Sequence, residues 1–231
     1  MAGSGRSLLE ADYSASQLRI VAHYCGVEML RQLFEGDEDL HAWAASKYFD
    51  VSPSEITATQ RAFGKMANFA PLYGASAKRI AEIGRSDYDL HLHVSEVEAL
   101  MGVFFESFPE IRDWHEMEAA TPTKNVITPL GRRIVLSEFG YNSRLAAPIQ
   151  AIEADAIKTA MVCLDAPVRA RGGRLLTPIN DALLYEVPDE EVVELARMVE
   201  AEMTRALRSM ISVPVRVDVM SGKDWGSMRR V

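Results

Sequence analysis

Residues 174–187 read RLLTPINDALLYEV, two apolar runs separated by Asn180 and Asp181. This pattern is typical of a β-hairpin, because Asn and Asp tolerate the positive φ angles that a tight turn requires. The short apolar segments Leu8–Asp12 and Val213–Val219 each predict a further strand. We therefore expect the two ends of the chain to pair into one sheet.

The sequence between these ends is mostly helical in pattern. Ser52 with Glu55 and Ser95 with Glu98 have the spacing of capping boxes, which mark helix starts. Periodicity predicts helices over 16–24, 27–34, 40–48, 57–70, 75–84, 95–106, 109–120, 143–168 and 189–209, and short strands over 126–128 and 133–136.

These elements predict an α+β fold, in which an antiparallel sheet is backed by helices and carries an inserted helical subdomain. The small polar residues 1–7 are interpreted as a flexible leader. The sheet-bearing part is expected over 8–24 and 125–231, and the helical insert over 25–124.

Composition narrows the class of protein. The 231 residues are 48% hydrophobic and 25% charged, which is ordinary for a globular protein and excludes a disordered, collagen-like or coiled-coil chain. No apolar run approaches the roughly 18 residues of a membrane span. Cys25 and Cys163 cannot form a disulfide framework, which favours a reducing cytoplasm. The net charge of −8 excludes a broad basic surface, so any nucleic-acid binding must use a local patch.

Asp12 ends an apolar strand and Asp181 lies at the tip of the predicted hairpin. Carboxylates at strand ends are well placed to share hard cations, since Mg²⁺ prefers oxygen ligands, and two of them could hold a two-metal site for phosphoryl transfer. The alternative is that Asp181 is there only for its turn chemistry.

Arg61, Lys65, Phe69 and Tyr73 recur every four residues. On one α-helix they would form a stripe about 18 Å long, with cations for a triphosphate followed by aromatic rings for a base or sugar. The alternative is an amphipathic helix with a solvated basic end and a buried aromatic end.

Several segments, in order, carry a family resemblance. DYSASQLRIVAH, RAFGKMANFAPLYG and PINDALLYEVP resemble motifs A, B and C of family A (Pol I-like) DNA polymerases, whose usual forms are DYSQIELRxxAH, RxxxKxxNFGxxYG and VHDELVFEVP. Between B and C, TPLGRRIVL and AAPIQAIEADAIKTAM resemble TxxGRRR and NAPIQGTAADIIKxAM, and SGKDW resembles the terminal SGxxW. The resemblance covers Leu8 to Trp225.

The resemblance implies a palm sheet, a fingers insert and template-directed transfer of a nucleotide from a dNTP to a primer 3′-hydroxyl. It implies that Asp12 and Asp181 hold two Mg²⁺ ions, with Mn²⁺ as an alternative, and that the Tyr13 carbonyl completes one shell. It also implies contacts with the dNTP: phosphates for Arg61, Lys65 and His41 (in DLHAWAA), the sugar for Phe69, the templating pair and sugar edge for Tyr73, and exclusion of ribonucleotides for Gln17.

Contacts with primer–template DNA are implied for Arg132, Arg133, Gln150 and Asn180. Taken alone, a pair of arginines in a loop is usually only solvated. The sequence also departs from the family pattern. Gln17 stands for Glu, Asn180 for His, Ala182 for the second acid of motif C, and Ala146 for Asn. Pro71 follows the position of the motif B glycine and should kink or end the helix, which bears on the placement of Tyr73.

Family A polymerases continue upstream of motif A with a thumb and the first part of the palm, and about eleven residues precede Asp12 here. This indicates either a split polymerase, in which a second polypeptide supplies these parts, or a fragment or a minimal relative of the family. We expect the second polypeptide, and a cytoplasmic location in a bacterium or a phage-infected cell. Two rival hypotheses are a non-catalytic DNA- or nucleotide-binding replication accessory and a purely structural helical protein. The second leaves the ordered motifs unexplained.

Overall fold

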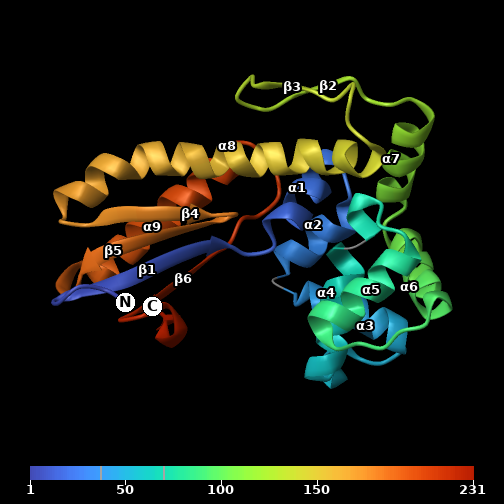
Figure 1. Cartoon of the computed structure of the whole chain (residues 1–231), viewed down its shortest axis with the longest axis horizontal. Helices are drawn as coiled ribbons and strands as arrows, with labels where there is room; N and C mark the ends of the chain where they lie inside the picture. Colours follow the sequence, from blue (N-terminus) through green and yellow to red (C-terminus); the bar gives the residue numbers. More distant parts are fainter. Residues whose placement is uncertain (37, 70) are drawn as a thin grey trace. The chain divides into compact units, whose positions relative to one another are not determined.

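The computed structural model describes residues 1–36, 38–69 and 71–231, and for Phe69 and Tyr88 it describes the backbone alone. The chain divides into two compact units, whose elements are labelled in Figure 1. The sheet unit comprises residues 1–20, 128–130 and 150–231, and the helical unit comprises residues 21–127 and 131–149.

The sheet unit is built on five antiparallel strands. Their order across the sheet is β4 (Arg174–Ile179), β5 (Ala182–Pro188), β1 (Arg6–Tyr13), β6 (Val217–Gly222) and β7 (Arg229–Arg230). Two short 3₁₀ turns, η3 (Asp189–Glu191) and η4 (Trp225–Ser227), belong to the same unit. The predicted pairing of the two chain ends in one antiparallel sheet is confirmed.

The hairpin that decides this fold has the expected turn. Asn180 has a φ of +53°, and Asn180 and Asp181 connect Ile179 to its partner Ala182. Strand β5, which lies between β4 and β1, is buried from Ala182 to Val187. Burial of each large apolar side chain there contributes roughly 1.5–3 kcal/mol, so the strand is anchored on both faces.

Helices cover the sheet as predicted. Helix α9 (Val192–Arg208) packs against β1, β5 and β6. The part of α8 (Tyr141–Ala170) that belongs to the sheet unit approaches α9 where Arg205 Nη2 lies 3.5 Å from Cys163 Sγ. The buried apolar residues of α9 recur at helical spacing, which explains why this face rather than its charged face meets the sheet.

The two ends of the sheet unit differ from the prediction. Residues 1–7 are not a separate leader, because β1 begins at Arg6 and the Gly3 amide donates to Glu186 Oε1 at 3.0 Å. Arg6 Nε also lies 3.0 Å from Glu186 Oε2, and this carboxylate is almost fully buried. At the other end, β6 covers Val217–Gly222 rather than 213–219. The start of β1 and the bounds of β6 were mispredicted for the same reason, because residues far away in the sequence determine where these strands begin and end.

Within its described residues, the helical unit contains six short helices of its own. They are α2 (Glu28–Glu35), α3 (Leu40–Phe49), α4 (Ala58–Phe69), α5 (Ala77–Tyr88), α6 (Val94–Ser107) and α7 (Pro109–Ala120). Helix α1 (Ser16–Tyr24) begins in the sheet unit and ends in the helical unit. The unit also holds the 3₁₀ turns η1 (Pro53–Glu55) and η2 (Pro71–Tyr73). No helix in the described ranges is long and apolar enough to cross a lipid bilayer.

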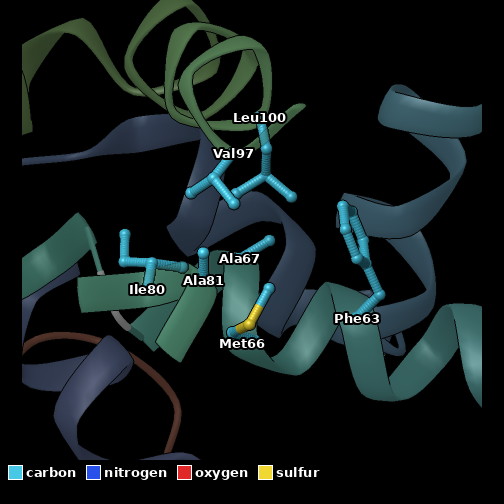
Figure 2. Packing of buried hydrophobic residues seen from close by; sticks show 7 residues of the cluster. All are labelled: Phe63, Met66, Ala67, Ile80, Ala81, Val97 and Leu100. Carbon is cyan, nitrogen blue, oxygen red and sulfur yellow. The ribbon is translucent and has the colours of Figure 1, made fainter. Parts of the chain in front are cut away.

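Helices α4, α5 and α6 share an apolar core, shown in Figure 2. Its members are Phe63, Met66, Ala67, Ile80, Ala81, Val97 and Leu100. Helix α3 packs closely on α4 at Gly64, where an added Cβ would lie 2.0 Å from the His41 carbonyl oxygen. Only glycine allows this approach, which fixes His41 beside α4.

Helix starts and ends are less regular than the capping pattern predicts. The box of Ser52 and Glu55 is present, but it caps the start of η1 rather than the start of α4. The box predicted at Ser95 and Glu98 is wrong, because α6 already begins at Val94 and its Glu96 accepts from the His93 amide at 2.7 Å. Glu96 and Glu98 could each close a capping box, so the sequence alone did not determine where α6 begins.

Pro71 acts on the chain as predicted. Helix α4 is described to Phe69, and Pro71 already belongs to η2, so α4 does not continue to Tyr73. The predicted last helical residue, Ala70, lies outside the described residues. A proline there lacks an amide donor and crowds the preceding turn, so a single helical stripe cannot reach Tyr73.

The division between units also differs from the predicted boundaries. Strands β2 (Asn125–Ile127) and β3 (Arg133–Val135) pair with each other as a separate hairpin. Residues 131–149 group with the helical unit. Arg144 pairs there with the buried Glu118 at 2.6 Å, and Asn142 Nδ2 donates to the Tyr73 carbonyl at 2.7 Å.

Candidate functional site

The sheet register brings Asp12 and Asp181 together. Asp12 is paired across the sheet with Ala182, the residue that follows Asp181 in the hairpin. The next amide of β1, that of Tyr13, donates to the Asp181 carbonyl oxygen at 3.3 Å. The two carboxyl groups share a hydrogen bond. Two acids that lie far apart in the chain thus form one carboxylate pair.

The pair lies in a strongly acidic environment. Loss of hydration raises the pKa of Asp12 to about 7, and the negative charges of Asp181, Glu10 and Asp218 act in the same direction. Without a cation, the pair therefore holds a proton near neutral pH. A divalent cation suits the same position, because it removes the repulsion between the two carboxylates.

The donor set fits Mg²⁺. The Tyr13 side chain is buried and its hydroxyl donates to the Met203 carbonyl at 2.6 Å, so only main-chain oxygen of Tyr13 is left for a ligand. Burial also raises the pKa of this hydroxyl. No cluster of three or more His, Cys, Asp or Glu side chains suited to a metal ion occurs in the part of the chain that the structure describes. Mg²⁺ commonly uses only one or two carboxylates and completes its shell with water and substrate phosphates.

Two acidic residues beside the pair were missed by sequence reasoning. Asp218 of β6 is directly paired with Asp12 and lies 3.0 Å from Arg230. Glu153 of α8 is buried, and burial raises its pKa. Strand pairing would have been needed to find Asp218. Glu153 had a signal, because it stands where the related motif has alanine.

Gln17 lies in the first turn of α1. Its Nε2 lies 3.4 Å from Glu153 Oε2, and the preceding Ser16 contacts both Glu153 and Asp181. The structure therefore places Gln17 in the same polar network as Asp181, within the sheet unit.

In the helical unit, Arg61 and Lys65 lie one turn apart on α4, and both are exposed. Arg61 Nε lies 2.6 Å from Asp39 Oδ2. The other oxygen of Asp39 caps α3 by accepting from the amides of His41 and Ala42. Partial burial raises the pKa of Asp39, but the hydrogen bonds from Arg61 and from these amides outweigh it and hold the pKa below its ordinary value.

His41 is held near the two cations. Burial lowers its pKa to about 4, and the charges of Arg61 and Lys65 act in the same direction. Asn68 Nδ2 lies 3.1 Å from the Leu40 carbonyl and 3.2 Å from His41 Nδ1. Because a carbonyl can only accept, the Asn68 amide must present its NH₂ group there, so His41 Nδ1 accepts and Nε2 carries the proton. Asn68 was in the motif but had no predicted role.

The two aromatic residues of the predicted stripe are not on one helix. Phe69 is the last described residue of α4, and its side chain lies outside the described part. Tyr73 is in η2 and is partly buried. The idea of a continuous helical stripe from Arg61 to Tyr73 is therefore wrong, because Pro71 intervenes.

The residues expected to contact DNA are dispersed. Asn180 is exposed at the hairpin turn beside Asp181, and Gln150 is exposed on α8 one turn before Glu153. Arg132 and Arg133 are exposed in the β2–β3 hairpin, where Arg133 donates to Asn125 Oδ1 at 2.9 Å. Asn180 and Gln150 thus belong to the sheet unit, and the arginines to the helical unit.

The comparisons with known proteins agree with one another. The family model for DNA polymerase family A matches residues 1–227. The chain is 32% identical over 237 residues to the thermostable DNA polymerase I of Thermus filiformis, covering 97% of the chain and 28% of that protein. It is 29% identical to DNA polymerase I of Aquifex aeolicus, covering 97% and 40% respectively.

A solved structure is also similar. The POL domain of Pol1 from M. smegmatis, in complex with DNA primer–template and dNTP, matches with a TM-score of 0.81 and 31% identity. The match covers 98% of this chain and 41% of that one. The chain thus spans well under half the length of these relatives. Its family model, its motifs and its fold nevertheless point the same way: the chain belongs to DNA polymerase family A.

Proposed function

We propose that this chain carries the catalytic centre of a template-directed DNA polymerase. In the reaction, the primer 3′-oxygen attacks the α-phosphorus of a dNTP, the bond to the bridging oxygen breaks, and pyrophosphate leaves while the hydroxyl gives up its proton. The observation that carries the proposal is the Asp12–Asp181 pair, in which a carboxylate at the end of β1 and a carboxylate in the β4–β5 turn share a hydrogen bond.

Asp12, Asp181 and the Tyr13 carbonyl are the proposed ligands of Mg²⁺, with Mn²⁺ as an alternative. When bound, two such ions would lower the pKa of the 3′-hydroxyl and neutralise charge on the triphosphate. The protein contributes fixed carboxylates, because β1 and the hairpin turn are anchored by their strand partners before substrate arrives.

The helical unit is proposed to bind the triphosphate. Arg61 and Lys65 supply positive charge from one face of α4, and His41 supplies a neutral donor at Nε2. Charge-assisted hydrogen bonds to phosphate are about twice as strong as neutral ones, so the cations should dominate. Arg61 must exchange its Asp39 partner for phosphate, whereas Lys65 is exposed on the next turn.

The remaining assignments follow the family motifs. We propose that Phe69 meets the sugar, that Tyr73 meets the templating pair and sugar edge, and that Gln17 fills the space a 2′-hydroxyl would need. Contacts with primer–template DNA are proposed for Arg132, Arg133, Gln150 and Asn180, the last supported by its exposure beside Asp181.

Charge supports weak binding of DNA by this chain alone. The net charge is −8, and several exposed arginines are already paired with carboxylates, among them Arg61, Arg171 and Arg230. Affinity for DNA grows with the number of phosphates that cations neutralise. We therefore propose a second polypeptide that supplies thumb and upstream palm contacts.

Incorporation of a single nucleotide tests the function. The chain is mixed at saturating concentration and low salt with a primer–template, the complementary dNTP and Mg²⁺, so that weak DNA binding does not limit the reaction. Primer extension by one nucleotide that is lost in Asp181→Asn is expected. Binding of DNA or dNTP without extension would instead support a non-catalytic accessory.

A further inference from the structure

A buried polar network lies behind the carboxylate pair of the sheet unit. Ser16 Oγ lies 2.5 Å from Glu153 Oε1 and 3.1 Å from Asp181 Oδ2. Gln17 Nε2 lies 3.4 Å from the other oxygen, Glu153 Oε2. Ser16 and Glu153 are both more than nine-tenths buried. One glutamate therefore contacts both the residue that touches Asp181 and the residue proposed to exclude ribonucleotides.

Three members of this network depart from the related motifs, and they do so together. Ser16 stands where motif A has Ile, Gln17 where it has Glu, and Glu153 where NAPIQGTAAD has its first Ala after Thr. Relative to these motifs, the network thus lacks a carboxylate on α1 and has one on α8. Contact between all three residues makes a coordinated exchange a better account than three unrelated substitutions.

The donors and acceptors of this network can be assigned. Gln17 presents its NH₂ group to Glu153, so its carbonyl oxygen is turned away from that carboxylate. The Ser16 hydroxyl lies within hydrogen-bond distance of both Glu153 and Asp181, and its contact with Glu153 is the shorter one. Glu153 sets the orientation of both neighbouring side chains.

We propose that Glu153 is a positioning residue for sugar selection, which holds Gln17 in the orientation that excludes a 2′-hydroxyl and keeps Ser16 in contact with both Glu153 and Asp181. The inference deepens the proposed polymerase function and rests on it. A buried carboxylate with two donors is costly to remove, but a purely structural role would not alter the choice between dNTP and rNTP.

Two single substitutions separate orientation from stability. Glu153→Gln keeps the shape and a partner for Ser16, but its own NH₂ group now faces Gln17, so the Gln17 amide must turn over. Glu153→Ala removes both contacts. We expect each variant to reduce discrimination between dNTP and rNTP about tenfold or more, because steric and polar rejection of an added group is lost. Thermal unfolding should change little in Glu153→Gln.

The most specific test moves the carboxylate from position 153 back to position 17. Gln17→Glu alone would place two carboxylates in contact, so we expect it to weaken nucleotide binding. The double variant Gln17→Glu with Glu153→Ala recreates the motif pattern, and we expect it to regain discrimination to within about threefold of wild type. Such a double-mutant cycle isolates the coupling between two contacting residues. Glu186→Gln is the matched control, since Glu186 is equally buried in the same unit but pairs with Arg6 and Arg174.

The experiment measures the ratio of incorporation efficiencies for dATP and ATP opposite template thymine. It also measures the dissociation constants of both nucleotides on a dideoxy-terminated primer–template, a readout without chemistry. Unchanged ratios in both Glu153 variants, or a double variant no better than Gln17→Glu alone, would overturn the inference and leave the polymerase proposal intact. A wild-type chain that incorporates neither nucleotide would overturn both.

Discussion

The sheet unit and the helical unit place opposite charges by different means. In the sheet unit, strand register sets Asp12 beside Asp181, and loss of hydration together with the surrounding acids raises the pKa of Asp12 to about 7. In the helical unit, α-helical spacing sets Arg61 and Lys65 on one exposed face, where Asp39 already balances one of them. In the sheet unit, the Asp12 and Asp181 carboxylates repel each other, and a bound cation would remove that repulsion. In the helical unit, Arg61 can exchange its ion pair with Asp39 for another anion.

This difference predicts that substitutions in the sheet unit affect the chemical step and that substitutions in the helical unit affect nucleotide binding. The proposed metal ligands are held by strand pairing, so changes to them should act on the chemical step. The cations proposed to bind the triphosphate lie on an exposed helix face, so changes to them should act mainly on nucleotide binding.

The largest effect is expected at the carboxylate pair. Asp12→Asn or Asp181→Asn should lower the rate of nucleotide incorporation by several orders of magnitude, because either change removes an anionic ligand from the centre of charge development. Incorporation of one nucleotide by a single turnover measures this loss. Asp165→Asn is a suitable control, since Asp165 is exposed on α8 and pairs only with Arg169 among the described contacts.

The fold should survive the loss of Asp12. Because its folded pKa of about 7 lies above the ordinary value of 3.8, this group's contribution to stability falls as the pH rises from about 4 to 7. At pH 8 without divalent cations, Asp12→Asn should melt at or above the temperature of wild type. A clearly lower melting temperature would show that the pair stabilises the sheet rather than straining it.

The second effect is expected in the helical unit. Lys65→Ala removes a charge-assisted phosphate contact worth roughly 1.5–3 kcal/mol, which corresponds to about a 10- to 150-fold loss of dNTP affinity. Arg61→Ala should lose less, because Arg61 gives up its ion pair with Asp39 when it binds phosphate. Titration with a non-hydrolysable dNTP measures both. Equal affinities in wild type and both variants would favour the alternative, in which Arg61 and Lys65 are only the solvated basic end of an amphipathic helix.

A third prediction concerns pH. The Asp12 carboxyl must lose its proton before it can bind a cation, so Mn²⁺ affinity should weaken by up to about tenfold per pH unit below pH 7 and level off above it. Electron paramagnetic resonance of free Mn²⁺ follows this binding. In Asp12→Asn the pH dependence should vanish, and a persistent slope in that variant would assign the proton to another group.

The smallest effect is expected at His41. With its pKa lowered to about 4 by burial and by the nearby cations, His41 stays neutral near pH 7 with its proton on Nε2. His41→Ala should therefore cost only a neutral hydrogen bond, about 0.5–1.5 kcal/mol or a 2- to 12-fold loss of dNTP affinity. Nitrogen-15 spectra of the imidazole test the tautomer. A protonated ring at pH 7 would contradict this account.

The sequence predicted best what local chemistry determines. The Asn180–Asp181 turn, the span of α1 and the interruption of α4 at Pro71 each depend on residues within one turn, and each is found. The hairpin places Asp181 next to Asp12 at the end of β1. The Asp12–Asp181 pair could therefore be predicted from the sequence.

Features set by distant partners could not be found in the same way. The start of β1 depends on Glu186, and the approach of Asp218 to Asp12 depends on the pairing of β6 with β1. Glu153 stands out in the sequence as a departure from the motif, but its burial and its contact with Ser16 depend on the fold. The boundary of the helical unit likewise depends on contacts of Arg144 with Glu118.

One measurement tests the contrast between the two units most directly. The rate of single-nucleotide incorporation is followed as a function of dNTP concentration for wild type, Asp181→Asn and Lys65→Ala. We predict that Asp181→Asn lowers the maximal rate by orders of magnitude, while Lys65→Ala mainly raises the dNTP concentration needed for half that rate. If Lys65→Ala lowers only the maximal rate, or Asp181→Asn retains it, the assignment of chemistry to the sheet unit and of triphosphate binding to the helical unit is wrong.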